Sequence, residues 1–388
     1  MDESSPLFVT PYIRSGKLLQ ARESSGPGAS CSVGIFNQHG PFKVDSNLGL
    51  QKREVALNKE FAVLYVDNPF GAGFSFTENP LGYAKCQTDI ANNLYEMLSQ
   101  FFQLFNEYKN TSLWIAGESY GGKFATTIAH KIHSMGNEAK ELGMNLTGIL
   151  IGSGFCDPRN MLNYDEMLFQ MGYIDDAERE YFKLEQAKIE KLIDNGSYAD
   201  AFHGFNELIH KSIYGLESHF SRTVGFKSLF DHTSMANTNS KLYCDLLKQK
   251  SICKEIHVGG IEFGKDKFQC QKNLIQDFLF SVKPLLETLL DSDYPILFWN
   301  GNLDILIAPV ITENYLKKLQ WKGSSRYYSA GRKILKLDEK SDYVDGYIRN
   351  VDNLTFAIIR NAGHLTFLDK PETVIKLMTD FINEKNIK

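Results

Sequence analysis

The chain has 388 residues, of which 43% are hydrophobic and 23% are charged, so it can bury a large core and is not disordered as a whole. A net charge of −5 and the lack of any Lys/Arg-rich run argue against a nucleic-acid partner. No apolar stretch approaches the roughly 18 residues that suggest a membrane span. The length suits two domains, or one large domain that carries an insertion.

The first half of the chain alternates between predicted strands and helices. Phe61–Pro69, "FAVLYVDNP", is an apolar run closed by turn residues and predicts a buried strand. Apolar residues then recur at helical spacing over Asp89–Tyr108, with Asp89 as the expected N-cap. A strand is predicted in Ser112–Gly122, "SLWIAGESYGG", followed by a helix that stops at Gly136. Leu146–Gly154 predicts another buried strand.

The pattern changes in the middle of the chain and then returns. Residues 157–291 are mostly helical by periodicity, whereas Tyr294–Asp304 and Leu354–Phe367 again contain buried strands, and a closing helix begins at Pro371. Strands that alternate with helices imply a mostly parallel sheet covered on both faces. We therefore predict an α/β core formed by residues 1–156 and 292–388, with residues 157–291 as a mostly helical cap insertion.

The segment "GESYGG" fits G-x-S-x-G, the nucleophile elbow of the α/β-hydrolase fold. In that motif the serine, here Ser119, occupies a strained turn between a strand and a helix, and Gly117 and Gly121 keep the turn tight. Both flanking elements are predicted here, so Ser119 is the candidate nucleophile. The alternative is a glycine-rich turn with a solvated serine.

A nucleophilic serine in this fold needs an acid and then a histidine later in the chain. Among nine histidines, His364 stands out because it follows an apolar strand in a loop of small residues, "NAGHLTF". Asp304 lies just past another buried strand, where a carboxylate can orient an imidazole. The order Ser119, Asp304, His364 predicts a serine hydrolase; a loop-capping role for Asp304 is the alternative.

Six cysteines and four N-x-[ST] sequons, which begin at Asn110, Asn145, Asn195 and Asn353, favour the secretory pathway. The first residues, however, have neither the basic nor the apolar region of a signal peptide. Cysteine pairing stays open, with a local bridge and free thiols as alternatives for Cys244 and Cys253. No cysteine–histidine spacing indicates zinc, and no metal, nucleotide or other cofactor is expected.

At these residues the sequence resembles the serine carboxypeptidases, in particular the vitellogenic-like branch. The shared segments occur in the same order over nearly the whole chain: "PLFVTPYI", "GPGAS", "HGPF", "LYVDNPFGAGFSF", "GESYGGKF", "NGNLDILIA" and "AGHLTF". The resemblance implies an α/β-hydrolase fold and removal of single residues from peptide C-termini through an acyl-enzyme, without a metal. It also implies a secreted or lysosomal glycoprotein, whereas the oligomeric state is left open.

The resemblance assigns further roles around the proposed triad. Gly26 and the backbone N–H of Tyr120 correspond to the oxyanion donors, and Glu118 to a carboxyl that helps recognise the substrate's terminal carboxylate. Two acids in one confined site would raise each other's proton affinity, which implies activity in acid. Gln38, however, stands where the family usually has a glutamate, and Ser24 where it has an amide. Both can still donate hydrogen bonds, so we keep them as substrate-binding candidates.

The family has a longer segment between "SGKLLQARE" and "GPGAS", which supplies a hairpin and the strand that leads into the oxyanion loop. We expect that strand to be absent here, which would remove the support beneath Gly26. This expectation favours an alternative function, a catalytically impaired relative that binds peptides or partners. A third possibility is an acyltransferase or esterase on the same scaffold, which Glu118 disfavours.

Overall fold

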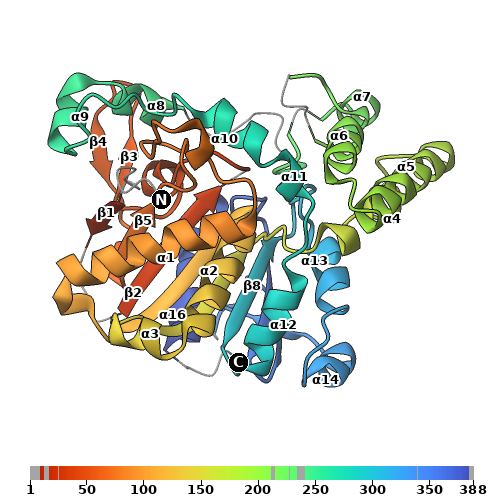
Figure 1. Ribbon diagram of the computed structural model, residues 1–388. Coiled ribbons are helices and arrows are strands. Elements are labelled where there is room, and N and C mark those ends of the chain that lie inside the picture. Colours follow the sequence, from red (N-terminus) through yellow and green to blue (C-terminus); the bar gives the residue numbers. More distant parts are fainter. Residues whose placement is uncertain are drawn as a thin grey trace.

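The computed structural model shown in Figure 1 describes most of the chain. The described residues are 9–12, 17–24, 26–210, 215–226, 228–233, 241–338 and 340–383.

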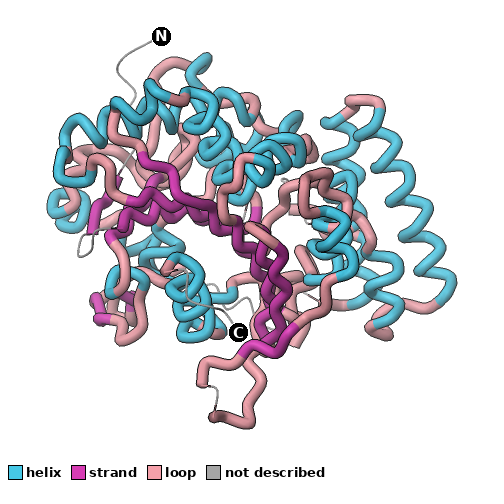
Figure 2. The backbone as a smooth tube through the Cα atoms, turned by 90° about the horizontal axis from the view of Figure 1, so that it is seen from below, coloured by secondary structure: helices cyan, strands magenta, loops and turns pink. Residues whose placement is uncertain are grey.

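A mixed sheet forms the centre of the molecule, and Figure 2 shows its strong twist. Within the described residues its strand order is β1-β5-β2-β6-β7-β8-β11-β10-β9. Neighbours from β5 to β11 in this order are parallel, whereas β1, β10 and β9 pair antiparallel at the two edges. The sheet strands are β1 (Val9–Tyr12), β2 (Lys17–Ser24), β5 (Ala62–Val66), β6 (Ser112–Ser119), β7 (Asn145–Gly152), β8 (Ile296–Gly301), β9 (Lys333–Leu335), β10 (Gly346–Val351) and β11 (Leu354–Ile359). A separate hairpin pairs β3 (Phe42–Val44) with β4 (Leu50–Lys52).

Helices cover both faces of the sheet (Figures 1 and 2). The helices outside residues 157–291 are α1 (Gln87–Leu104), α2 (Gly121–Met135), α3 (Asn137–Glu141), α13 (Pro309–Leu316), α14 (Ser324–Ser329), α15 (Thr366–Asp369) and α16 (Pro371–Ile382). The helices between β7 and β8 are α4 (Tyr164–Gln170), α5 (Asp176–Asp194), α6 (Tyr198–Leu208), α7 (His219–Val224), α8 (Leu242–Leu247), α9 (Lys250–Glu255), α10 (Lys267–Asn273), α11 (Ile275–Phe278) and α12 (Lys283–Asp291).

Alternation along the strands divides the core into two layers. In β6, Leu113 and Ile115 belong to the cluster that contains α1 and α2, whereas Trp114 and Ala116 belong to the cluster beneath α16. Successive side chains of a strand point to opposite faces, so a strand buried on both sides is apolar throughout. This explains why the apolar runs in the sequence predicted the central strands well.

The α/β-hydrolase prediction is confirmed, and the predicted central elements form where they were expected. The prediction that Asp89 caps the first long helix is wrong, because α1 begins at Gln87 with Cys86 as its N-cap. Asp89 lies within the first turn, where its side chain accepts a hydrogen bond from the backbone N–H of Lys85 at 2.9 Å. The sequence analysis also missed β1, β9 and β10, whose apolar patterns are weak; β1 and β9 are the edge strands, and β10 lies between β9 and β11.

The expectation that the strand before the oxyanion loop is absent is also wrong. Residues Lys17–Ser24 form β2, which inserts between β5 and β6 and is parallel to both. In its register Ser24 lies opposite Ser119. Pairing on both sides fixes this strand, and that long-range pairing cannot be read from "KLLQARES" alone. Gly26 therefore follows an inner strand of the sheet.

The segment proposed as a cap contributes helices both to the periphery and to the main core. Figure 1 shows α4–α7 projecting beside the sheet, whereas α12 packs against α2. The buried residues Phe182 and Phe205 belong to the same apolar cluster as Ile115 of the sheet. The division at residues 157 and 291 stays a proposal.

None of the six cysteines, all of which lie in described parts of the chain, forms a disulfide. Cys31, Cys156 and Cys270 are buried, whereas Cys86 is exposed. The Cys253 thiol donates to the Leu247 carbonyl at 3.3 Å. The local bridge considered for Cys244 and Cys253 is therefore not formed in this structure.

Candidate active site

Ser119 occupies a sharp turn at the end of β6. Its φ is +57°, in the left-handed region, and α2 begins two residues later at Gly121. A Cβ on Gly117 would lie 2.1 Å from the Gly121 carbonyl oxygen, so no larger residue fits there. A serine held in this strained conformation at a strand-to-helix turn has the local structure of a nucleophile elbow.

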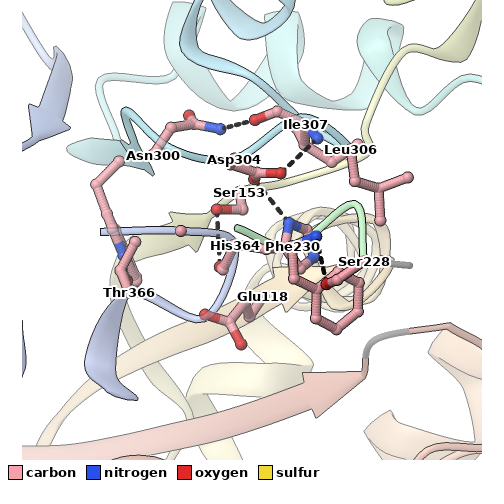
Figure 3. Close-up of polar contacts among 12 residues, drawn as sticks. Glu118, Ser153, Ser228, Phe230, Asn300, Asp304, Leu306, Ile307, His364 and Thr366 are labelled. Atoms are coloured by element: carbon pink, nitrogen blue, oxygen red, sulfur yellow. Dashed lines mark hydrogen bonds and ion pairs between the residues drawn. The ribbon is translucent and has the colours of Figure 1, made fainter. Parts of the chain in front are cut away.

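Asp304 and His364 meet in the loops that follow β8 and β11. Asp304 Oδ2 lies 2.7 Å from His364 Nδ1, and both side chains are completely buried (Figure 3). The other oxygen, Asp304 Oδ1, accepts a hydrogen bond from the Ile307 backbone N–H at 2.9 Å. With both carboxylate oxygens engaged, Asp304 can hold the imidazole in one orientation with the Nδ1 proton directed towards itself.

The electrostatics of His364 favour a basic imidazole. Burial is the largest single influence and lowers the pKa of His364, but Asp304 and Glu118 together outweigh it, so that the pKa is raised above 6.5. Nε2, the nitrogen opposite Asp304, makes no hydrogen bond to any described residue, Ser119 included. It therefore has a lone pair available to accept a proton once a substrate brings the reacting groups together.

Two residues that the sequence analysis missed hold the His364 backbone. The Ser153 hydroxyl, just after β7, donates to the His364 carbonyl at 3.1 Å, and His364 N donates to the Phe230 carbonyl at 2.6 Å. The Phe230 ring lies 4.8 Å from the imidazole, centroid to centroid. Ser153 has a φ of +43° in "IGSG", a turn after a buried strand that could have drawn attention to it. Phe230 lies in an irregular loop and has no sequence signal.

The proposed oxyanion donors are Gly26, in the loop after β2, and Tyr120, the residue that follows Ser119. Gly26 has a φ of +126°, a conformation that favours glycine. It comes shortly after β2, the strand that pairs with β6. Tyr120 is the N-cap residue of α2, where backbone N–H groups are unpaired and point away from the helix. The buried Asp67 anchors the loop after Gly26, because its carboxylate accepts hydrogen bonds from Ser30 Oγ at 2.6 Å and Cys31 N at 2.8 Å.

The two proposed carboxylate-binding side chains that the structure describes contact each other. Gln38, in the π-helical turn Gly34–Gln38, donates through Nε2 to Glu118 Oε2 at 2.8 Å, and both side chains are buried. The sequence analysis kept Gln38 as a hydrogen-bond donor, and Glu118 is an acceptor for it in this structure. The third candidate, Ser24, belongs to β2, and its side chain lies outside the described residues.

A buried polar network ties the elbow to α11, and the sequence gave no indication of it. The Tyr120 hydroxyl donates to Asp277 Oδ2 at 2.6 Å, and the backbone N–H of Gln87 donates to Asp277 Oδ1 at 2.9 Å. The fully buried Lys123 ammonium donates to the carbonyl oxygens of Asp277, Phe278 and Phe280 at 3.2, 2.5 and 2.6 Å. Burial lowers the pKa of Lys123 to about 8, although Asp277 opposes this effect.

A pocket of about 290 Å³ opens beside Ser119. It is lined by Gly26, Pro27, Ser119, Tyr120, Phe155, Phe202, Phe205, Asn206, His210, Gln271, Leu274, Phe278, Leu306 and Ile307. The nucleophile, both proposed oxyanion donors and a mostly apolar wall therefore surround one space, which is a common composition for a small-molecule or peptide site.

No group of three or more histidine, cysteine, aspartate or glutamate side chains among the described residues is arranged to hold a metal ion. Nor does that part of the chain contain a helix with the length and apolar character needed to cross a membrane.

Comparison with known proteins gives a consistent result. The family model described as "Serine carboxypeptidase" matches residues 24–384. The chain is 33% identical to the human "Probable serine carboxypeptidase CPVL", over 99% of this chain and 91% of the relative. It is 36% identical to the "Venom serine carboxypeptidase" of Apis mellifera, with 93% and 76% covered, and 34% identical to the "Vitellogenic carboxypeptidase" of Aedes aegypti, with 92% and 75% covered.

A solved structure supports the fold. The prohormone-processing carboxypeptidase from Saccharomyces cerevisiae superimposes with a TM-score of 0.81 at 20% sequence identity, over 98% of this chain and 88% of the other. The arrangement at the carboxyl ends of β6, β8 and β11, the family match and the relatives agree: this chain is a hydrolase that belongs to the serine carboxypeptidase family.

Proposed function

We propose that the protein releases single residues from peptide C-termini through an acyl-enzyme formed on Ser119. The observation that carries this proposal is the buried 2.7 Å contact between Asp304 and His364, located at the same edge of the sheet as the strained Ser119 turn. Ser119 Oγ attacks the last peptide carbonyl while His364 Nε2 takes the hydroxyl proton. His364 then gives this proton to the departing amino acid, and water cleaves the acyl-enzyme by the same steps.

Two backbone N–H groups, those of Gly26 and Tyr120, stabilise the oxyanion that forms during attack. Each such donor typically lowers the barrier by about 2.7–4 kcal/mol. The Asp304 carboxylate stabilises the imidazolium without itself taking the proton. The turn at Gly26 and the N-terminus of α2 supply these donors from rigid elements, which limits reorganisation during the reaction.

Glu118 and Gln38 recognise the free carboxylate of the substrate. Gln38 donates one of its amide N–H groups to Glu118 Oε2, so Glu118 orients the Gln38 amide and the second amide N–H can bind the substrate's carboxylate. Ser24 is the third candidate for this role. Recognition by these groups makes the enzyme an exopeptidase, because an internal peptide bond has no carboxylate to present.

The helices of residues 157–291 cap the active site in this proposal. Half of the residues that line the pocket come from this segment, among them Phe202, Asn206 and Phe278. The cap therefore shapes the space for the side chains beside the scissile bond. Peptide or protein C-termini are the partners, and a secreted or lysosomal location is supported by the family, by the sequons and by the venom relative's name.

The test compares Ser119→Ala with Ser134→Ala, which removes an exposed hydroxyl from α2. With N-blocked dipeptides assayed between pH 5 and 8, Ser119→Ala should abolish release of the terminal amino acid, whereas Ser134→Ala should behave as wild type. A fluorophosphonate probe should label wild type and Ser134→Ala only. Unchanged release by Ser119→Ala would overturn the proposal, and a folded wild-type protein that neither reacts nor cleaves would favour the peptide-binding alternative.

A further inference from the structure

Aromatic rings surround the pocket beside Ser119. They come from the elbow, the loop after β7, α6 and α11, and they are Tyr120, Phe155, Phe202, Phe205 and Phe278. Phe278 is central: its ring stacks on Tyr120 at 5.3 Å and contacts Phe155 at 5.6 Å and Phe202 at 5.1 Å, centroid to centroid. Such a wall favours a planar aromatic guest, because ring pairs contribute about 0.5–1.5 kcal/mol beyond the area that they bury.

One polar side chain in this wall has an unsatisfied group. Asn206 lies on α6 one turn after Phe202 and beside Phe205, and only 4% of it is exposed. Its Nδ2 makes no hydrogen bond to any residue that the structure describes. A buried amide group left unpaired costs about 1–3 kcal/mol. The other amide and imidazole in the lining, Gln271 and His210, are only half-buried, so water can reach them.

The position of the pocket identifies the substrate residue that enters it. The lining includes Ser119 and both proposed oxyanion donors, but neither Glu118 nor Gln38. The C-terminal residue carries the carboxylate that Glu118 and Gln38 would bind, so its side chain lies on their side of the nucleophile. The pocket is therefore left for the penultimate residue, whose carbonyl carbon Ser119 attacks.

We propose that this pocket selects tyrosine at the penultimate position of the substrate, with Asn206 as the residue that distinguishes tyrosine from phenylalanine. The inference rests on the proposed carboxypeptidase function. The phenol ring packs among the five aromatic rings, and its hydroxyl bonds the Asn206 amide. Because a phenol both donates and accepts, it satisfies the amide in either of its two orientations. A phenylalanine ring fills the same space but leaves the amide unpaired.

The experiment measures kcat/KM for N-blocked dipeptides that share one C-terminal residue and differ only in the penultimate residue: tyrosine, phenylalanine or leucine. Wild type should prefer tyrosine to phenylalanine by about tenfold or more, as expected when a site built for a hydroxyl meets a substrate without one. Asn206→Leu, nearly the same size, should reduce this ratio to about one or below. Cleavage of the leucine substrate should change by less than about threefold. Asn92→Leu, at an exposed position of α1, should keep the wild-type ratio.

A second measurement does not depend on activity. Because the Asn206 amide is unpaired in the free protein, Asn206→Leu should leave the Tm unchanged or raise it. A fall in Tm, or a wild-type enzyme that cleaves the tyrosine and phenylalanine dipeptides equally well, overturns the Asn206 proposal and leaves the proposed function intact. Failure of wild type to cleave any of the three dipeptides overturns the proposed function, and this inference with it.

Discussion

His364 shows how three neighbouring influences set the basicity of one residue. Complete burial disfavours the imidazolium, whereas the carboxylates of Asp304 and Glu118 favour it, and the balance raises the pKa of His364 above 6.5. In the proposed mechanism only the neutral imidazole can take the proton of Ser119. When the solution is acidified, His364 with a raised pKa becomes protonated at a higher pH, and activity is lost at that higher pH.

We predict that kcat/KM rises with pH through an apparent pKa above 6.5, and that Glu118→Gln moves this limb to lower pH. The substitution removes a negative charge that stabilises the imidazolium, so the pKa of His364 falls. The measurement is kcat/KM for an N-blocked dipeptide from pH 4.5 to 8.5, with the position of the acidic limb as the readout. A limb that stays in place would show that Glu118 does not act on His364.

This expectation differs from the acidic activity that the family resemblance implies. That expectation concerned Glu118 beside the substrate's carboxylate, whereas the acidic limb proposed here is set by the pKa of His364; in this chain Glu118 also accepts a hydrogen bond from the neutral amide of Gln38, where the family usually has a glutamate. By the same electrostatic argument, Gln38→Glu, which adds a carboxyl group beside Glu118, should leave the acidic limb in place or move it to higher pH. A wild-type kcat/KM that is highest near pH 5 would show that the raised pKa of His364 does not set the acidic limb.

At the scale of elements, one short helix within residues 157–291 is hydrogen-bonded to both α1 and α2. α11 carries Asp277, whose carboxylate accepts hydrogen bonds from the first residue of α1 and from the hydroxyl of Tyr120. Lys123 on α2 binds three carbonyl oxygens in and just after α11. The same helix presents Phe278 to the pocket. The polar network therefore fixes the pocket wall to α1 and to α2, the helix that follows the elbow.

We predict that Asp277→Ala lowers the free energy of unfolding by about 3–5 kcal/mol, as expected when one member of a buried charged network is removed. The N–H groups of Gln87 and the Tyr120 hydroxyl would lose their acceptor, and the buried Lys123 would lose a nearby negative charge. Equilibrium unfolding in urea measures the loss. Asp342→Ala, at an exposed aspartate, should stay within about 0.5 kcal/mol of wild type. An equally small effect of Asp277→Ala would mean that the network does not hold α11.

At the scale of the whole molecule, the sheet and the helices of residues 157–291 share one apolar cluster. The four N-x-[ST] sequons differ in how far their asparagines are exposed. Asn110, Asn145 and Asn195 are exposed. Asn353 differs, because its side-chain N–H groups donate to the carbonyl oxygens of Leu290 at 2.9 Å and Tyr294 at 2.8 Å. Its amide nitrogen is occupied inside the fold, whereas a glycan needs an accessible one.

We predict that secreted protein, expressed behind a signal peptide, carries glycans only at a subset of Asn110, Asn145 and Asn195. Peptide mapping by mass spectrometry after enzymatic deglycosylation would identify the modified asparagines. Substitution of the three exposed asparagines by glutamine should remove all glycan mass, and Asn353→Gln alone should remove none. A glycan found on Asn353 would show that modification precedes closure of this part of the fold.

The sequence alone determined the features that depend on local pattern and order. The apolar runs of β5, β6, β7, β8 and β11 predicted the central strands, because strands buried on both faces must be apolar throughout. The turn at Ser119 was predictable because Gly117 and Ser119 satisfy a local steric requirement. Asp304 and His364 could be proposed as its partners because each follows one of these apolar strands. The family resemblance, rather than any periodicity, supplied Gly26, Tyr120, Glu118 and Gln38.

Only the tertiary structure decided what depends on contacts between distant segments. β2 is a strand because β5 and β6 pair with it on both sides, and its own residues give little sign of this. Asp277 meets Tyr120 across 157 positions of sequence, and Phe230 meets His364 although neither has a local motif that requires the other. Likewise, the sequence gave no sign that the Asn206 amide is unpaired and lies in the wall of an aromatic pocket. The physical reason is that hydrogen-bond partners and pocket walls are chosen by folding, which brings together residues whose spacing along the chain carries no record of the contact.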